Sequence, residues 1–175
     1  MVKTNGHCCD DFAVERHATR NSPYHFVDSG LPNVFLAGIR YFVCKKCGKQ
    51  AAEIPAVEKL MQTIARTIVE TESQLTGAEI RFLRKRLRKK AVEFAKIVSV
   101  TPEQVSRWEN DSNPPDKSTD KLIRMYYGAE SGDPHLRKMT GDWLKTISEL
   151  TPLRGIRVDL SRGREWKTQA AVAGR

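Results

Sequence analysis

The feature that most constrains the fold is a run of short helix-forming segments between residues 75 and 128. Two of these segments, AVEFAKIVS and TPEQVSRWEND, are separated by almost no chain. The first contains the small residue Ala95, the turn falls at Ser99 and Val100, and the second contains the apolar Val105. A small residue, a tight turn and an apolar anchor in this order let two helices cross closely. The sequence therefore predicts a helix-turn-helix.

The two helices of the motif are flanked by further amphipathic segments. GAEIRFLRKRLR comes before them and is basic on all sides but one, as expected for a helix with one buried face. The positions expected to face the core are Ile80, Leu83 and Leu87 in this segment and Val92, Ala95 and Val98 in the next.

Start signals delimit the later helices. Thr101 is placed as a helix N-cap, with Pro102 at the first helical position. DSNPPDKS interrupts the pattern, and Ser118 or Thr119 is expected to start a fourth helix. Beyond Gly128, DPHLRKMTGDWLKTISEL predicts one more helix, and the remaining residues predict a weak strand and a loose tail.

The third helix carries the side chains best suited to reading bases. Val105 and Trp108 lie one turn apart and are expected to be buried, which leaves Glu103, Gln104 and Arg107 exposed. The major groove, about 12 Å wide, admits one such helix. Glutamine can pair with adenine, arginine with guanine, and glutamate can accept from cytosine. Arg107 is the strongest candidate for base reading.

Hydroxyls and cations near this helix suit contacts with phosphate, which position a protein without specifying sequence. The formal net charge of +9 favours a polyanionic partner such as nucleic acid. By itself, the run RFLRKRLRKK could equally be the solvated face of an amphipathic helix. Glu109 is expected to form a structural salt bridge or cap. The expected phosphate contacts are Arg88, Lys89, Lys90, Thr101 and Ser106.

A second constraint is the stretch YFVCKKCGKQ. Cys44 and Cys47 stand two residues apart with Gly48 directly after, the usual form of half a tetrahedral zinc site. The only other cysteines, Cys8 and Cys9, are adjacent in GHCCDD. Both can be ligands only if the backbone there is irregular, because neighbouring side chains of an extended chain point to opposite faces. The alternatives are Cys8 with Asp11, or one cysteine with His7, His17 or His25.

Several functional classes are disfavoured by the sequence. No apolar run approaches the roughly 20 residues that span a bilayer, and the N-terminus lacks the apolar core of a signal peptide. We therefore expect a cytoplasmic protein whose cysteines are thiolate ligands rather than disulfides. We do not expect an enzyme, because CKKC lacks the strand-to-helix context of a redox motif and the DD pair has no accompanying acidic cluster.

The segment LTGAEIRFLRKRLRKKAVEFAKIVSVTPEQVSRWENDSNPP resembles the helix-turn-helix of the XRE (lambda repressor-like) superfamily. Together with CKKCG, residues 5 to 127 resemble the MqsA/YgiT-type family, in which a zinc-binding domain with two CxxC pairs precedes an XRE-type domain. The resemblance implies base contacts by Arg107 and Glu103. Two positions depart from the family: Lys90-Ala91 replace the usual glutamine or serine, and Ser99 replaces the glycine of the turn.

That family includes antitoxins that dimerise through the C-terminal domain, bind palindromic operators and repress their own operon. The resemblance therefore implies double-stranded DNA, a second copy of the chain and a cognate toxin as partners, with zinc as cofactor. The alternative is a toxin-neutralising interaction module in which DNA binding is secondary.

The expected fold class is α+β. Short strands are predicted within residues 22–44, and apolar residues at helical spacing from Val57 to Ile68 predict a helix that starts near Pro55 and runs to about Glu72. The predicted organisation is a zinc-binding domain at 1–54, a connecting helix at 55–74, a helix-turn-helix domain at 75–128 and a C-terminal extension at 129–175.

Overall fold

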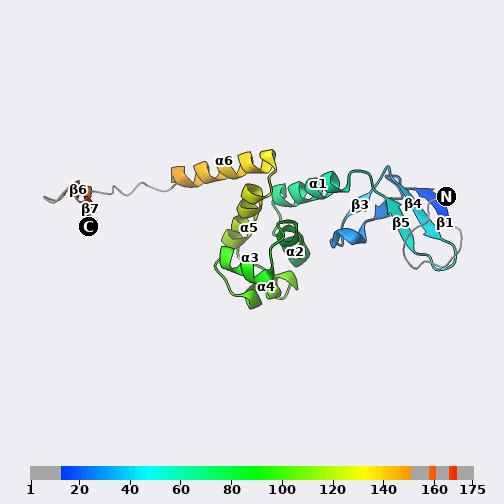
Figure 1. Cartoon of the computed structure of the whole chain (residues 1–175), viewed down its shortest axis with the longest axis horizontal. Coiled ribbons are helices and arrows are strands. Elements are labelled where there is room, and N and C mark those ends of the chain that lie inside the picture. Colours follow the sequence, from blue (N-terminus) through cyan, green and yellow to red (C-terminus); the bar gives the residue numbers. More distant parts are fainter. Residues whose placement is uncertain (1–12, 151–157, 161–165, 169–175) are drawn as a thin grey trace. The chain divides into compact units, whose positions relative to one another are not determined.

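A computed structural model describes residues 13–150, 158–160 and 166–168, with side chains described for residues 13–144. The fold is α+β, as predicted: the described residues form six α-helices and small antiparallel sheets (Figure 1). The chain divides into two compact units, residues 1–140 and residues 141–175, and each is described by itself.

The first unit begins with a three-stranded antiparallel sheet of order β1-β4-β5. In its register, Ala13 lies opposite Cys44 and His17 lies opposite Arg40. A second, two-stranded antiparallel pair is formed by β2 and β3. The short strands predicted within residues 22–44 are thus confirmed as β2, β3 and β4, whereas β1 and β5 lie outside the predicted stretch. Their bounds are β1 (Ala13–His17), β2 (Tyr24–His25), β3 (Phe35–Leu36), β4 (Arg40–Cys44) and β5 (Gln50–Glu53).

A small aromatic core lies under these strands. The rings of Tyr24 and Tyr41 are tilted against each other with centroids 5.3 Å apart. Leu60 and Met61 of α1 (Val57–Glu70) pack against this core, so the predicted connecting helix is confirmed and contributes to the N-terminal core. The buried residues of the cluster are Ala18, Tyr24, Phe26, Leu36 and Tyr41.

Four helices follow, close to the predicted places: α2 (Gly77–Arg86), α3 (Ala91–Ile97), α4 (Pro102–Glu109) and α5 (Lys117–Glu130) (Figure 1). The start of α2 is a capping box, in which Thr76 and Glu79 satisfy each other's backbone N–H groups. The fully buried side chains of these four helices include Ile80, Leu83, Phe94, Val105 and Ile123.

Two details of this region differ from the sequence prediction. Val92, expected to face the core, is 51% exposed, and Phe94 is buried in its place. The seven-residue α3 can direct only one face inward, and that face carries the larger side chain. Ser118 or Thr119 was expected to start α5, but its N-cap is Asp116. The carboxylate of Asp116 accepts from the backbone N–H groups of Ser118 and Thr119.

The predicted last helix is confirmed as α6 (Pro134–Leu150). The second unit also contains an antiparallel pair, β6 (Val158–Leu160) and β7 (Trp166–Thr168), where one weak strand was predicted. Within the described part of the chain, no helix is long and apolar enough to cross a membrane.

Candidate nucleic-acid interface

A short turn, residues 98–101, joins α3 to α4. Ala95 and Val105 are both buried, and the backbone N–H of Val100 donates to the carbonyl of Ala95 at 2.9 Å. Ser99 has a φ of +56°, in the left-handed region that glycine adopts most cheaply. The turn therefore needs a left-handed backbone at position 99, where glycine would be the usual residue, and Ser99 adopts that conformation.

The N-terminus of α4 is capped as predicted. The hydroxyl oxygen of Thr101 accepts from the backbone N–H of Gln104 at 3.2 Å, and Pro102 occupies the first helical position. Val105 and Trp108 are buried, which confirms the predicted inner face. The outer face is formed by exposed or half-buried residues: Glu103, Gln104, Ser106 and Arg107.

Glu103 differs from the other outer residues because its carboxylate has local partners. Its own backbone N–H, then the Thr101 side chain, and finally the charge of Arg107 lower the pKa of Glu103 below its usual value. The carboxylate is therefore ionised at neutral pH. The N-terminus of α4 stabilises a negative charge at this position, and the carboxylate in turn repels other anions nearby.

The C-terminal end of α4 is held by a buried ion-pair cluster around Glu109. Arg84 donates to both oxygens of Glu109, from Nε at 2.5 Å and from Nη2 at 2.9 Å, and Arg81 donates to the same carboxylate at 3.2 Å. The side chains of Glu109 and Arg84 are only 8% and 12% exposed. The predicted structural role of Glu109 is confirmed. Sequence reasoning did not assign Arg81 and Arg84, because both lie in the basic run RFLRKRLRKK.

A close backbone contact also fixes α4 against α2. A Cβ atom at Gly77 would lie 2.3 Å from the carbonyl oxygen of Trp108, so only glycine fits there. The backbone N–H of Gly77 donates to Oδ1 of Asp111 at 2.6 Å. The orientation of α4 is therefore set by its core residues, the ion-pair cluster and this contact together.

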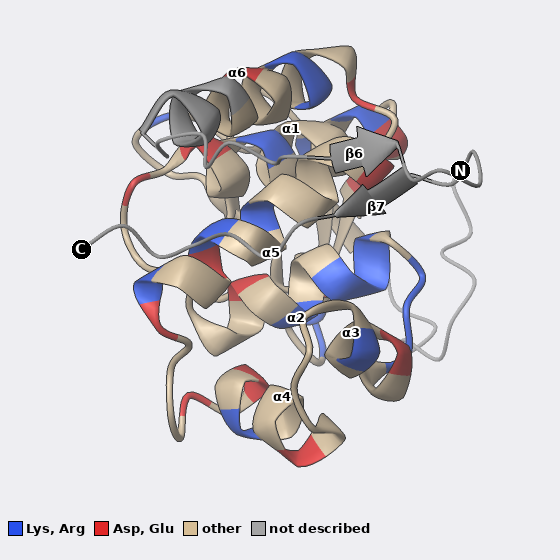
Figure 2. Cartoon of the chain, turned by 90° about the vertical axis from the view of Figure 1, so that its left-hand side faces the viewer, with Lys and Arg blue, Asp and Glu red and all other residues tan. Residues whose placement is uncertain are grey.

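The loop between α2 and α3 contains three consecutive cations: Arg88, Lys89 and Lys90. Figure 2 shows basic residues at the end of α2, in this loop and on α3, while α4 carries both signs of charge. Earlier in the basic run, Arg81, Arg84 and Arg86 pair with carboxylates. The run is thus divided into a structural part on α2 and a loop whose three cations form no ion pair with the described residues.

The predicted metal half-site lies where β4 turns into β5. Cys44 is buried and Cys47 is exposed. Gly48 has a φ of +72°, and its N–H donates to the carbonyl of Cys44 at 2.9 Å. Residues 13–144 contain no group of three or more potential metal ligands. The other candidate ligands, Cys8 and Cys9 with His7 and Asp11, lie outside the described residues.

The strand register discriminates between the alternatives for the second half-site. His17 lies four residues along the β1–β4 pair from the position of Cys44, roughly 13 Å at strand spacing. His25 has its Nε2 2.9 Å from the carbonyl of Pro32 and its ring stacked on Phe35. The register thus disfavours His17 as a ligand that shares a metal ion with Cys44. The ring of His25 is held by its contacts with Pro32 and Phe35.

The same register favours the N-terminal segment. Ala13, the first described residue, is opposite Cys44, close in the chain to Cys47. The four residue steps from Cys9 to Ala13 span at most about 14 Å. Ligands from GHCCDD are therefore within reach of this half-site.

No protein-family model and no curated protein sequence matches this chain.

Proposed function

We propose that the protein is a sequence-specific DNA-binding transcriptional regulator, of the MqsA/YgiT type, that represses its own gene as an antitoxin-like dimer. The observation that carries this proposal is α4: a capped helix with an exposed polar face, held by buried core residues. A rigid helix with a polar outer face is the element that enters the major groove in helix-turn-helix proteins. The role is non-enzymatic, and the compartment is the cytoplasm.

In this proposal Arg107 and Gln104 read base edges. Their two positions lie on the outer face of α4, and Arg107 is exposed. Arg88, Lys89 and Lys90 with the hydroxyls of Thr101 and Ser106 contact phosphates. Glu103 orients Arg107 or accepts from cytosine.

Replacing Arg107 with alanine is expected to cost about 1–3 kcal/mol at the preferred DNA site and much less on random DNA. The site is first selected from a random DNA pool, and affinities are then measured by fluorescence anisotropy. Lys138→Ala, which removes an exposed cation from α6, is the matched control. Equal losses on selected and random DNA would show that Arg107 contacts only the backbone.

A homodimer is part of the proposal because short operators are usually read as two half-sites one helical turn apart. On α5, a stripe of apolar residues at helical spacing is exposed or half-buried. Such a stripe suits a symmetric helix-to-helix contact. Its members are Leu122, Met125, Tyr126 and Ala129.

Zinc is the proposed cofactor, bound by Cys44 and Cys47 with Cys8 and Cys9 or with the altered set that includes Asp11. Thiolates at this spacing present both sulfurs from one tight turn. The metal would stabilise the N-terminal sheet, whose described aromatic core is small.

We expect about one zinc ion per chain by elemental analysis, and loss of that zinc in Cys44→Ser and Cys47→Ser. A chelator should lower the melting temperature of the wild type but not of these variants. Cys8→Ser, Cys9→Ser and Asp11→Asn then identify the other ligands. A zinc-free wild type purified from zinc-supplemented cells would exclude the site.

A second candidate function is protein interaction by the N-terminal sheet. Val27 and Phe35 are 59% and 57% exposed. Exposed apolar side chains on a small domain suit a protein partner such as a toxin. Copurification of a small protein encoded next to this gene, abolished by Phe35→Ser, would favour this function over plain regulation.

A further inference from the structure

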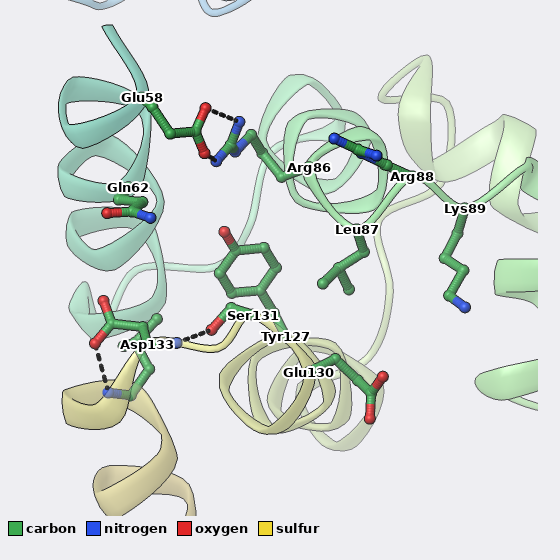
Figure 3. Close-up of a pocket in the computed structure, with 11 residues that line it drawn as sticks. Glu58, Gln62, Arg86, Leu87, Arg88, Lys89, Tyr127, Glu130, Ser131 and Asp133 are labelled. Carbon is green, nitrogen blue, oxygen red and sulfur yellow. Dashed lines mark hydrogen bonds and ion pairs between the residues drawn. The ribbon is translucent and has the colours of Figure 1, made fainter. Parts of the chain in front are cut away.

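A cavity of about 270 Å³ opens between α1, the end of α2, the loop that follows it and the end of α5 (Figure 3). Its walls combine an aromatic ring, two leucines and several charged groups. The hydroxyl of Tyr127 points toward the ion pair between Glu58 and Arg86. The residues that define the chemistry of the cavity are Glu58, Arg86, Arg88, Lys89, Tyr127 and Asp133.

The charges in this cavity are unevenly compensated. Glu58 is paired with Arg86, and Asp133 accepts from Arg66 at 2.7 Å and from the N–H of His135 at 2.9 Å. Arg88 and Lys89 form no ion pair with the described residues, and Glu130, also unpaired there, is the one remaining acid in the wall. With Arg66 counted as the partner of Asp133, the cations at the cavity outnumber the acids by one, and besides Arg86 the charge of Arg88 also helps to lower the pKa of Glu58.

Hydrogen-bond donors accompany these cations. Burial raises the pKa of Tyr127, so its hydroxyl stays protonated at neutral pH. Nε of Arg86 is buried and has no hydrogen-bond partner. Leu87 and Leu136 provide apolar surface beside the ring. This combination suits a small molecule that has an anionic group and a short apolar or planar body.

The cavity is physically connected to α4. The backbone carbonyl of Lys89 accepts from Nη1 of Arg84 at 2.8 Å. The same guanidinium donates to Glu109, the last residue of α4. Arg88 has a φ of +55°, a conformation that costs energy for a non-glycine residue. A shift of this loop is therefore transmitted to the guanidinium that holds α4.

We propose that this cavity is an effector site for a small organic anion, carboxylate or phosphate monoester, bound by the Arg88–Lys89 loop, Arg86 and Tyr127. Its occupancy alters the position of α4 through Arg84. The ligand site is independent of DNA binding, whereas its regulatory consequence rests on the proposed function. By linkage, the anion and DNA change each other's affinity by the same factor.

The test is an NMR titration of the full chain, without DNA, with phenyl phosphate and with benzoate as probes and benzyl alcohol as neutral control. Saturable amide shifts are expected at Leu87, Arg88 and Ser131, with a smaller shift at Glu109. Absence of saturable shifts with both anions, or equal shifts with benzyl alcohol, would overturn the site. Loop shifts that leave Glu109 unchanged would overturn the connection to α4.

Two variants with matched controls assign the binding to these residues. Glu58→Gln releases Arg86 and is expected to strengthen phenyl phosphate binding several-fold, a gain that misfolding cannot produce. Its control is Glu53→Gln, which removes another exposed arginine-paired carboxylate. Arg88→Gln is expected to weaken binding about tenfold, and Lys85→Gln on the exposed part of α2 is not. Equal effects within either pair would contradict the assignment.

Discussion

Replacing Glu109 with alanine is expected to lower the free energy of unfolding of the helical part by about 3–5 kcal/mol, the usual cost of removing one partner from a buried ion pair. The carboxylate is 8% exposed and is the acceptor for both Arg84 and Arg81. Without it, the 12% exposed guanidinium of Arg84 keeps its charge but loses its partner. Urea unfolding followed by far-UV circular dichroism measures the change.

The controls for Glu109 separate charge from packing. Glu72→Ala removes an exposed carboxylate and should change stability by less than about 0.5 kcal/mol. Glu109→Gln retains the shape but not the charge, so an intermediate loss is expected. Replacing Glu109, Arg84 and Arg81 together with apolar residues should recover much of the loss, because no buried charge then lacks a partner. A loss for Glu109→Ala no larger than for Glu72→Ala would contradict the buried cluster.

Replacing Arg124 with methionine is expected to be about equally costly, roughly 3–5 kcal/mol, for a different reason. This 5% exposed residue on α5 pairs with Asp120 at 2.6 Å. The variant therefore leaves the buried carboxylate of Asp120 with the N–H of Leu75 as its one partner among residues 13–144. The guanidinium of Arg124 also donates to four backbone carbonyls at and beyond the end of α1, and the variant removes these hydrogen bonds. The acceptors are the carbonyls of Ile68, Val69, Thr71 and Ser73.

The measurement for Arg124 is amide hydrogen exchange together with urea unfolding. Protection should fall most at the C-terminal end of α1, since two of the lost bonds are to carbonyls within its last turn and two are to carbonyls just beyond it. Arg124→Lys should rescue little, because an ammonium group lacks the planar fork that reaches several acceptors. Arg137→Met, at an exposed position of α6, is the control. Unchanged protection of α1 in Arg124→Met would show that these bonds do not hold it.

The helices of the middle region could be predicted because each local signal agreed with the final packing. Thr101 and Pro102 mark the start of α4, and Val105 and Trp108 mark its inner face. Val92 was placed wrongly because a seven-residue helix has too few positions for periodicity to define its inner face. The larger Phe94 occupies the core instead.

The connections between distant segments could not be predicted in this way. Arg84, Arg86 and Arg88 look alike in the basic run, yet the first pairs with Glu109, the second with Glu58, and the third forms no ion pair within residues 13–144. Which cation is structural depends on long-range packing, and a single sequence does not contain that information locally. The cavity beside Tyr127 is lined by three separate segments of the chain, so it could not be predicted for the same reason.

The most direct test of the central proposal is a titration of the purified protein against the DNA upstream of its own gene, with shuffled DNA of equal length as control. Measurements at two salt concentrations separate phosphate contacts from base reading. The proposal predicts tight binding to the upstream fragment, strong preference over the shuffled DNA and a steep loss of affinity with salt. Weak binding without preference at both salt concentrations would contradict it.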